Sequence, residues 1–438
     1  MKKMKLRPNT AVLLLSLFAF ANSGVAEPGD GIRFGNGWSL SPFVAGTVTY
    51  DSNVLLRHDD YERNEELNEP ERDDDVFYDL VGGLSLIKET DDITMNLRGL
   101  AKLRSYEIYT TLDDETFQQN FDAVLGDADG IRIKLSQQYS HVSDYEFTRE
   151  ESGLKEQDMV TLRLIETRTR RTDRYIEDYG VSVMDDFSKL QLQGDLGYGK
   201  VAFGDDTPIY FPKRDLRDWD EYQGSVNVGY RMTDKSSVFI APSIGQHHSD
   251  NGLDTSTFVK FRAGFRSEPT IKLTYSIGCG LQYYRGGDNT AELDDINFGT
   301  TSSSDDLELQ FFHYDLKAAW ALTRRTDFQI FGRNEMIPTS AFDNNTKRVD
   351  QGSIGLIQRL GQKWSTSLGL SYRQDTYTLP INGVDAHEEL AGILWKIQYD
   401  ARKSWLQVTA QARYEEFTSN IQEDYQQLRA TLSADISY

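Results

Sequence analysis

Apolar and polar residues alternate with a period of two along most of the chain. Between residues 427 and 438 every second residue is apolar, namely Leu428, Ala430, Leu432, Ala434, Ile436 and Tyr438. The same alternation recurs at 93–103, 271–283 and 406–414. A helix would scatter these side chains around its axis, whereas consecutive residues of a β-strand point to opposite faces of a sheet. The pattern therefore predicts an all-β protein.

The alternation predicts eighteen strands that are joined by connections of two kinds. The strands span residues 38–50, 75–88, 92–108, 117–126, 130–147, 174–187, 189–203, 219–231, 236–249, 256–267, 270–286, 306–322, 326–337, 347–360, 364–378, 387–401, 404–418 and 424–438. Strands of soluble proteins usually have about 5–6 residues, whereas about 9–11 residues cross a bilayer. Short turns such as 361–363 alternate with long polar connections such as 148–173, as in outer-membrane barrels.

These features predict a transmembrane antiparallel up-and-down β-barrel of about 18 strands over residues 38–438. Two alternatives stay open. The region 157–187 is difficult to divide into strands, so a barrel of sixteen strands also fits the sequence. A soluble propeller or a tandem of β-sandwiches would also alternate, although no internal sequence repeat accompanies the pattern.

The first 26 residues have the features of a secretory signal peptide. Basic residues precede the apolar run 11–21, and small residues follow it up to Ala26. The run is shorter than the roughly 20 residues of a membrane-spanning helix. We therefore expect a signal peptide at 1–26, a short periplasmic segment at 27–37, and a barrel in the outer membrane of a diderm bacterium. The aromatic C-terminal residue Tyr438 is typical of strands that the barrel-insertion machinery recognises.

Composition argues against several functions. The chain has 69 acidic and 47 basic residues, so repulsion from phosphate opposes nucleic-acid binding. A single cysteine excludes an intramolecular disulfide framework and a cysteine-based metal cluster. The adjacent His247 and His248 point to opposite faces of a strand, and the sequence has no nucleophile elbow or zinc-type spacing. We expect no enzymatic activity, no catalytic residue, no metal and no cofactor.

The alternation also assigns strand residues to the lipid or to the lumen. Seventeen basic residues fall on the predicted luminal face: Arg98, Lys102, Arg104, Arg132, Lys134, Arg231, Lys260, Arg262, Arg266, Lys272, Lys317, Arg333, Arg359, Arg373, Lys396, Arg413 and Arg429. Nine acidic residues share it: Asp79, Asp122, Asp178, Asp195, Asp315, Glu335, Asp375, Glu415 and Asp435. Many of the other acidic residues lie in polar loops, with eleven of them between residues 51 and 75.

A basic wall around an aqueous channel would concentrate anions, because the confined lumen focuses the positive potential. A polyanion would meet successive weak binding positions along this wall. All of the basic residues except Arg359 therefore form the candidate substrate path, and the predicted luminal aromatic residues Tyr284, Phe312 and Phe331 could stack on sugar rings. In the alternative interpretation, luminal carboxylates pair with the basic residues and only neutralise the wall.

The first predicted strand and its exit, residues 42–57, read Pro-Phe-Val-Ala-Gly-Thr-Val-Thr-Tyr-Asp-Ser-Asn-Val-Leu-Leu-Arg. This segment resembles the opening of outer-membrane β-barrel porins of the barrel porin 2 type, whose first strand ends in a Tyr-Asp-x-Asn-Val-like motif. The resemblance implies an outer-membrane channel associated with exopolysaccharide gene clusters. Asp51 and Asn53 also suit a turn cap at the end of a strand.

We therefore expect an outer-membrane channel that exports an acidic exopolysaccharide through a basic lumen. A general diffusion porin for small anionic solutes, or a surface or structural barrel without transport, is the alternative. The expected partners are outer-membrane lipid and lipopolysaccharide, the polysaccharide, an export partner in the periplasm or inner membrane, and the barrel-insertion machinery. No nucleic acid is expected as a partner.

Overall fold

The computed structural model describes residues 31–54, 74–109, 113–126, 130–142, 174–203, 218–249, 255–285, 308–338, 346–378, 384–401, 406–420 and 424–437. Among these residues, no helix is long and apolar enough to cross a membrane. The predicted signal peptide and most of the acidic loop 51–74 lie outside the described residues. The first part of the region 157–187, which is difficult to divide into strands from sequence, lies outside them up to residue 173.

The described chain forms nineteen strands: β1 (Ile32–Arg33), β2 (Trp38–Asp51), β3 (Asp75–Glu89), β4 (Ile93–Tyr106), β5 (Asp114–Leu125), β6 (Arg132–Val142), β7 (Arg174–Phe187), β8 (Leu190–Phe203), β9 (Trp219–Thr233), β10 (Ser236–Ser249), β11 (Thr255–Thr270), β12 (Leu273–Arg285), β13 (Glu308–Ala321), β14 (Thr326–Pro338), β15 (Thr346–Arg359), β16 (Trp364–Tyr377), β17 (His387–Asp400), β18 (Leu406–Ser419) and β19 (Tyr425–Ser437).

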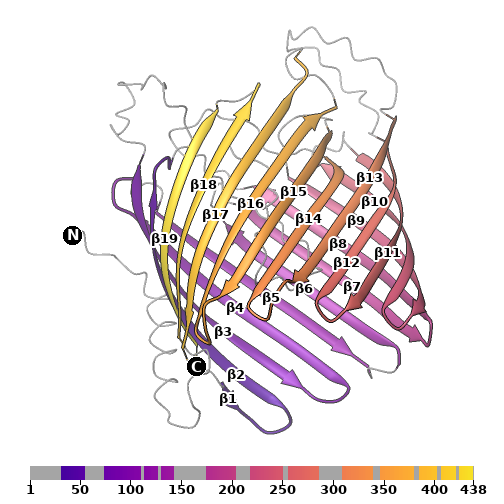
Figure 1. Ribbon diagram of the computed structural model, residues 1–438, viewed down its shortest axis with the longest axis horizontal. Helices are drawn as coiled ribbons and strands as arrows, with labels where there is room; N and C mark the ends of the chain where they lie inside the picture. Colours follow the sequence, from indigo (N-terminus) through magenta and orange to yellow (C-terminus); the bar gives the residue numbers. More distant parts are fainter. Residues whose placement is uncertain are drawn as a thin grey trace.

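The strands β2 to β19 close into one antiparallel barrel (Figure 1). Each strand pairs with its successor in the chain, and β19 returns to pair with β2. β1 adds only two residues, paired with β2, and is not part of the closed wall. The predicted barrel of eighteen strands is confirmed, and the alternatives of sixteen strands or a soluble propeller are wrong.

The two ends of the barrel differ in their connections. At one end, called here the short-turn end, hairpins such as β7–β8 and β15–β16 join their strands through a few residues, and the C-terminus lies at this end (Figure 1). Gly126 begins one such turn with φ of 110°, and a Cβ there would lie 2.1 Å from the carbonyl oxygen of Ile131. The opposite end, called here the long-loop end, carries the long connections.

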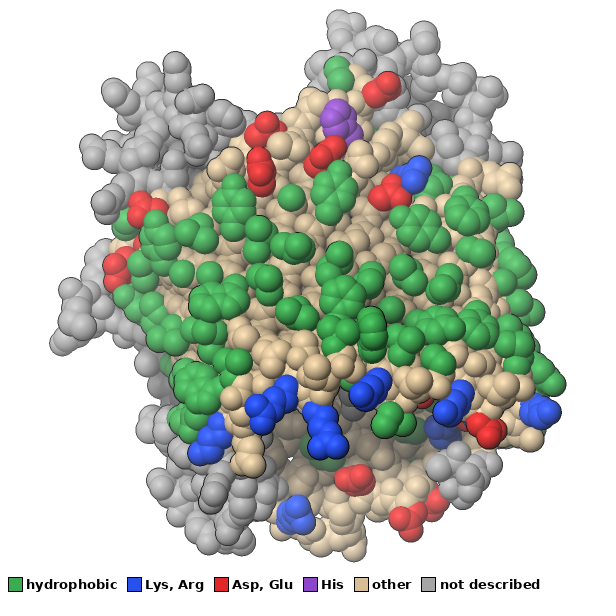
Figure 2. Space-filling view, in the orientation of Figure 1, with side chains coloured by type: hydrophobic (Ala, Val, Ile, Leu, Met, Phe, Trp, Pro, Cys, Tyr) green, Lys and Arg blue, Asp and Glu red, His purple; other side chains and the backbone are tan. Residues whose placement is uncertain are grey.

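The outer face of the barrel is a belt of apolar side chains (Figure 2). Leu97, Ile277 and Leu432 are exposed on it, while their neighbours in sequence point inward. A wall that alternates in this way can meet hydrocarbon outside and water inside. The predicted strand phase therefore agrees with the structure at these positions.

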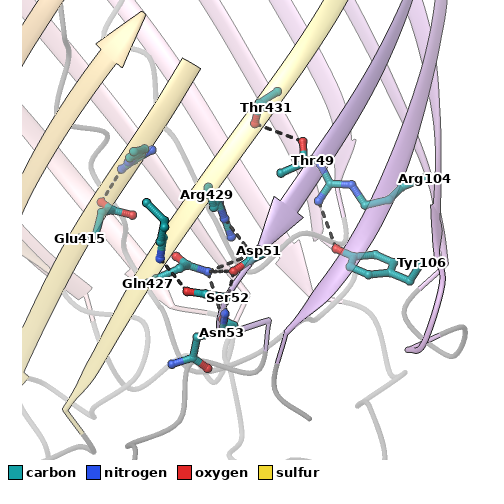
Figure 3. Close-up of polar contacts among 12 residues, drawn as sticks. Thr49, Asp51, Ser52, Asn53, Arg104, Tyr106, Glu415, Gln427, Arg429 and Thr431 are labelled. Atoms are coloured by element: carbon teal, nitrogen blue, oxygen red, sulfur yellow. Dashed lines mark hydrogen bonds and ion pairs between the residues drawn. The ribbon is translucent and has the colours of Figure 1, made fainter. Parts of the chain in front are cut away.

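A cluster that we call the closure clasp joins the end of β2 to β19 (Figure 3). Its centre is Asp51, which is only 1% exposed. The Asp51 carboxylate accepts hydrogen bonds from the backbone N–H of Asn53 (3.0 Å), from Nε2 of Gln427 (2.9 Å) and from Nε of Arg429 (2.8 Å). The clasp thus holds the first and last barrel strands together.

Ser52 adds to the clasp, because its backbone N–H donates to the carbonyl of Leu428 (3.0 Å) and its hydroxyl accepts from the Leu428 N–H (2.8 Å). The bond from Asn53 N–H to Asp51 is an Asx-type turn, so the interpretation of this motif as a turn cap is confirmed. The motif that carried the family resemblance therefore has a structural role in closing the barrel.

The ladder between β13 and β14 breaks in the half near the long-loop end. These strands pair only from Asp315 with Arg333 to Ala321 with Asp327, although β12–β13 and β14–β15 stay paired beyond this point. Beyond the break, the Asn334 side-chain amide donates a hydrogen bond to the Phe312 carbonyl and accepts one from the Tyr314 N–H. The amide thus replaces the backbone groups of β14 that would pair with β13 in a regular ladder.

The same half of β14 leans into the lumen. Nε2 of Gln282 on β12 donates to the Met336 carbonyl (2.9 Å), and its Oε1 accepts the Met336 N–H (3.2 Å). In a regular sheet β12 and β14 would lie about 10 Å apart, with β13 between them. Contact through one glutamine therefore requires that β14 passes over the inner face of β13, which narrows the lumen.

Candidate functional site

Fifteen of the sixteen candidate path residues lie on strands with their side chains on the inner face. Arg98 and Lys396, for example, follow the exposed outer residues Leu97 and Trp395. Lys272 is the exception and a correction, because it occupies the exposed turn between β11 and β12. The strand β12 begins later than the sequence pattern predicts, at Leu273.

Most of these inward cations have a carboxylate partner. The ion pairs are Arg104–Asp79 (2.7 Å), Arg132–Asp186 (3.0 Å), Arg231–Asp186 (3.5 Å), Lys260–Glu335 (3.8 Å), Arg262–Asp315 (3.2 Å), Arg333–Glu335 (3.7 Å), Arg373–Asp375 (2.6 Å), Arg413–Glu415 (2.5 Å) and Arg429–Asp51 (2.8 Å). Several of these ion pairs are nearly excluded from water, so each charge mainly neutralises its partner within the wall.

The inner wall carries more acidic residues than the sequence pattern predicts. Further carboxylates share the inner face by register or by ion pairing: Asp51, Asp75, Asp114, Asp186, Glu221, Asp327, Glu388 and Asp400. The missed cation, Lys347, pairs with Asp375 (2.7 Å). The predicted surplus of basic over acidic residues is therefore wrong for the wall as a whole. Each missed acidic residue lies within three residues of a strand end, where the predicted boundaries and phase are weakest.

Five inward cations make no ion pair within the described part of the chain, and we call them the cationic tier: Arg98, Lys134, Arg266, Lys317 and Lys396. They come from β4, β6, β11, β13 and β17, around the circumference of the barrel. Counted from the short-turn end, each is between the third and the sixth residue of its strand. These five cations therefore lie at a similar depth, in the half of the lumen near the short-turn end.

Three described carboxylates face the lumen in regular strand register at the depth of the cationic tier, namely Asp122, Asp195 and Asp435. Glu268 lies at the same depth near the end of β11, beyond the regular register with β12. Asp195 accepts hydrogen bonds from the hydroxyl groups of Ser182 (2.5 Å) and Ser225 (3.0 Å). The tier therefore keeps an excess of positive charge, in contrast to the paired wall nearer the long-loop end.

Aromatic rings support some of these cations. The guanidinium groups of Arg98 and Arg266 lie over Phe43 and Phe239, at 4.7 and 4.5 Å from the ring centroids. Tyr284 and Phe331 lie on the inner face, as predicted. Phe312 is wrongly predicted as luminal. It is 56% exposed on the outer face, since His313 and Asp315 take the inward positions of β13.

No family model and no curated protein matches this chain in sequence. Similar solved structures include OccK1 (OpdK) of Pseudomonas aeruginosa, with 10% identity and a TM-score of 0.47 over 91% of this chain and 99% of that one. OccAB4 of Acinetobacter baumannii has 9% identity and a TM-score of 0.44 over 94% and 100%. The ferric-catecholate import receptor Fiu of E. coli has 9% identity and a TM-score of 0.45 over 90% and 81%. Similarity at this level assigns no solute to the present chain.

Proposed function

We propose that the chain is an outer-membrane channel for small anionic solutes, and that the cationic tier gives it anion preference. One observation carries this proposal: five inward cations without ion-pair partners in the described chain share one level of a closed barrel, where three described carboxylates face the lumen in regular register. Unneutralised cations on the wall of a confined lumen attract anions and raise their local concentration.

The outer surface supports a position across a bilayer. A row of Lys and Arg side chains borders the apolar belt at the short-turn end (Figure 2). The exposed basic residues of these turns are Lys189, Lys235, Lys272, Arg324, Arg325 and Lys363. Basic groups next to an apolar belt lie at the depth of lipid phosphates, to which they are attracted. In barrels of this kind the short turns face the periplasm.

Export of an acidic exopolysaccharide is the second candidate. Its support is the resemblance of residues 42–57 to barrel porins of the exopolysaccharide-associated type, together with cations on several sectors of the wall. Two observations favour small solutes instead. The ion pairs neutralise much of the predicted polyanion path, and the inward lean of β14 narrows the lumen.

The ion selectivity of the purified channel in a planar bilayer tests the proposal. In a potassium chloride gradient the reversal potential should show preference for chloride, and this preference should weaken at high salt as screening increases. Replacing the five residues of the cationic tier by Gln should lower the preference. The matched control replaces five exposed turn lysines and arginines by Gln and should leave it unchanged. Preference for potassium in the unaltered channel would refute anion transport, and no conductance at all would favour a structural barrel.

A strain that lacks the protein separates the two candidates. If the channel passes small anions, uptake of such solutes should fall while surface polysaccharide stays constant. Loss of surface polysaccharide, restored by the wild-type gene, would instead favour export.

A further inference from the structure

Two cations of the cationic tier flank a serine in one row across the wall. Arg266 on β11 is in register with Ser276 on β12, and Ser276 is in register with Lys317 on β13. The three side chains therefore share the inner face of the barrel. Neighbouring strands lie about 4.8 Å apart, so the Cα atoms of Arg266 and Lys317 are separated by about 10 Å. Two such long side chains can both reach one small group above Ser276.

The charges near this row leave both cations available. Asp315, which is two residues from Lys317 on β13, pairs with Arg262 (3.2 Å). Glu268 follows Arg266 on β11 after the regular register with β12 ends, and makes no ion pair among the described residues. The row therefore keeps two positive charges and a hydroxyl group on the lumen.

Phenylalanine rings hold the two cations close to the wall. Phe239 lies 4.5 Å from the Arg266 guanidinium and 5.1 Å from that of Arg262, and Phe331 lies 5.7 Å from Nζ of Lys317. A ring face attracts a cation without neutralising its charge.

Glycine keeps the wall beside the row clear. Gly278 follows Ser276 on the inner face of β12, and a Cβ there would lie 2.3 Å from Oδ1 of Asp315 and 3.2 Å from Cδ of Arg262. A larger residue at 278 would displace the Asp315 carboxylate, so glycine leaves the Arg262–Asp315 pair undisturbed.

We propose that Arg266, Ser276 and Lys317 form a binding site for an oxyanion, that is, for the carboxylate or phosphate group of a small solute. The planar guanidinium of Arg266 donates two parallel hydrogen bonds to the oxyanion, and the Lys317 ammonium supplies a second positive charge. The Ser276 hydroxyl donates one further hydrogen bond. This inference rests on the proposed anion channel and adds the position and chemistry of one solute site within it.

The test uses the purified full-length channel in a planar bilayer, with inorganic phosphate and acetate as the two probes. Each probe should reduce the chloride current in a saturable way. The double variant Arg266→Gln/Lys317→Gln should raise the half-blocking concentration about tenfold or more, because charge-assisted hydrogen bonds are lost. Ser276→Ala should raise it by about two- to fivefold, since it removes one neutral donor.

The matched control is Arg98→Gln/Lys134→Gln, which removes two charges from the same tier on other strands. Both double variants should lose a similar part of the chloride preference, but only the first should lose the block. Equal loss of block in both would show that the probes respond to the overall potential, and would overturn the site. A chloride-selective channel without saturable block would also overturn the site while leaving the proposed function intact, whereas a cation-selective channel would refute the proposed function.

If the double variant does not insert, Arg266→Lys answers the same question, because it keeps the charge and removes the planar fork. It should preserve chloride preference and weaken block by phosphate and acetate. Unchanged block would overturn the assigned role of Arg266.

Discussion

Replacing Asp51 by Ala should destabilise the barrel more than any other single change at the β2–β19 seam. The substitution removes the shared acceptor of three donors and leaves the Arg429 guanidinium, whose side chain is 15% exposed, without its carboxylate. Breaking a buried ion pair from one side costs about 3–5 kcal/mol. Since Arg429 keeps some contact with water, we expect a value near the lower end, about 3 kcal/mol.

The measurement is urea unfolding of the protein in phosphatidylcholine vesicles, followed by tryptophan fluorescence. Thr49→Ala is the matched control, because it removes one hydroxyl hydrogen bond to Thr431 (3.2 Å) across the same seam. It should cost about 0.5–1.5 kcal/mol. Asp51→Asn should fall between the two, since its amide oxygen can still accept the Asn53 N–H.

A double-mutant cycle with Arg429→Ala separates the ion pair from the other contacts of the clasp. The coupling free energy between positions 51 and 429 should be about 1–3 kcal/mol. The reasoning would be refuted if Asp51→Ala cost no more than Thr49→Ala, or if the coupling were zero. Either result would mean that the backbone ladder alone closes the barrel.

Three further predictions concern the wall. Leu97→Arg should impair insertion, because a lipid-facing arginine costs about 2–4 kcal/mol near mid-membrane, while the adjacent Asn96→Arg should be tolerated. The measurement for both is the fraction of protein that migrates as the folded barrel in unboiled samples on a denaturing gel. Gln282→Ala should destabilise the barrel in urea by about 1–3 kcal/mol or more, because two backbone groups of Met336 lose their buried partner. Arg359→Ala should change stability by less than about 1 kcal/mol in the same assay, because the side chain of this rim residue is 49% exposed beside Asp327.

Lipid on one side and water on the other explain why the strand number could be predicted from sequence. Each spanning strand must alternate, so segments such as 93–103 and 427–438 are recognisable one at a time without knowledge of their neighbours. The boundaries were less certain, because polar residues at a strand end suit a loop equally well. Asp51 lay one residue beyond its predicted strand and is the centre of the closure clasp.

The break between β13 and β14 could not be predicted, because its causes lie between strands rather than within one. β13 alternates through Phe312 and Tyr314 like any paired strand. The inward lean of β14 becomes evident only from the contacts of Gln282 and Asn334, whose partners are 54 and 20–22 residues away. Gln282 lies on the polar face of β12, where a glutamine has no sequence signal that distinguishes this role from ordinary exposure to water. Asn334 shares the phase of Ile330 on β14, so a polar residue among outward-facing apolar positions is the one sequence sign of the irregularity.

Charged residues have different roles in the two halves of the wall: stability near the long-loop end and anion attraction near the short-turn end. Toward the long-loop end, arginines such as Arg373 and Arg429 are paired with buried carboxylates, so replacing them should mainly lower stability. Toward the short-turn end, Arg98, Arg266 and Lys317 keep their charge available to the lumen. An anion entering from the long-loop end would pass a nearly neutral wall before it reaches the cationic tier. Selectivity should therefore depend on these few cations and not on the total number of basic residues that line the barrel.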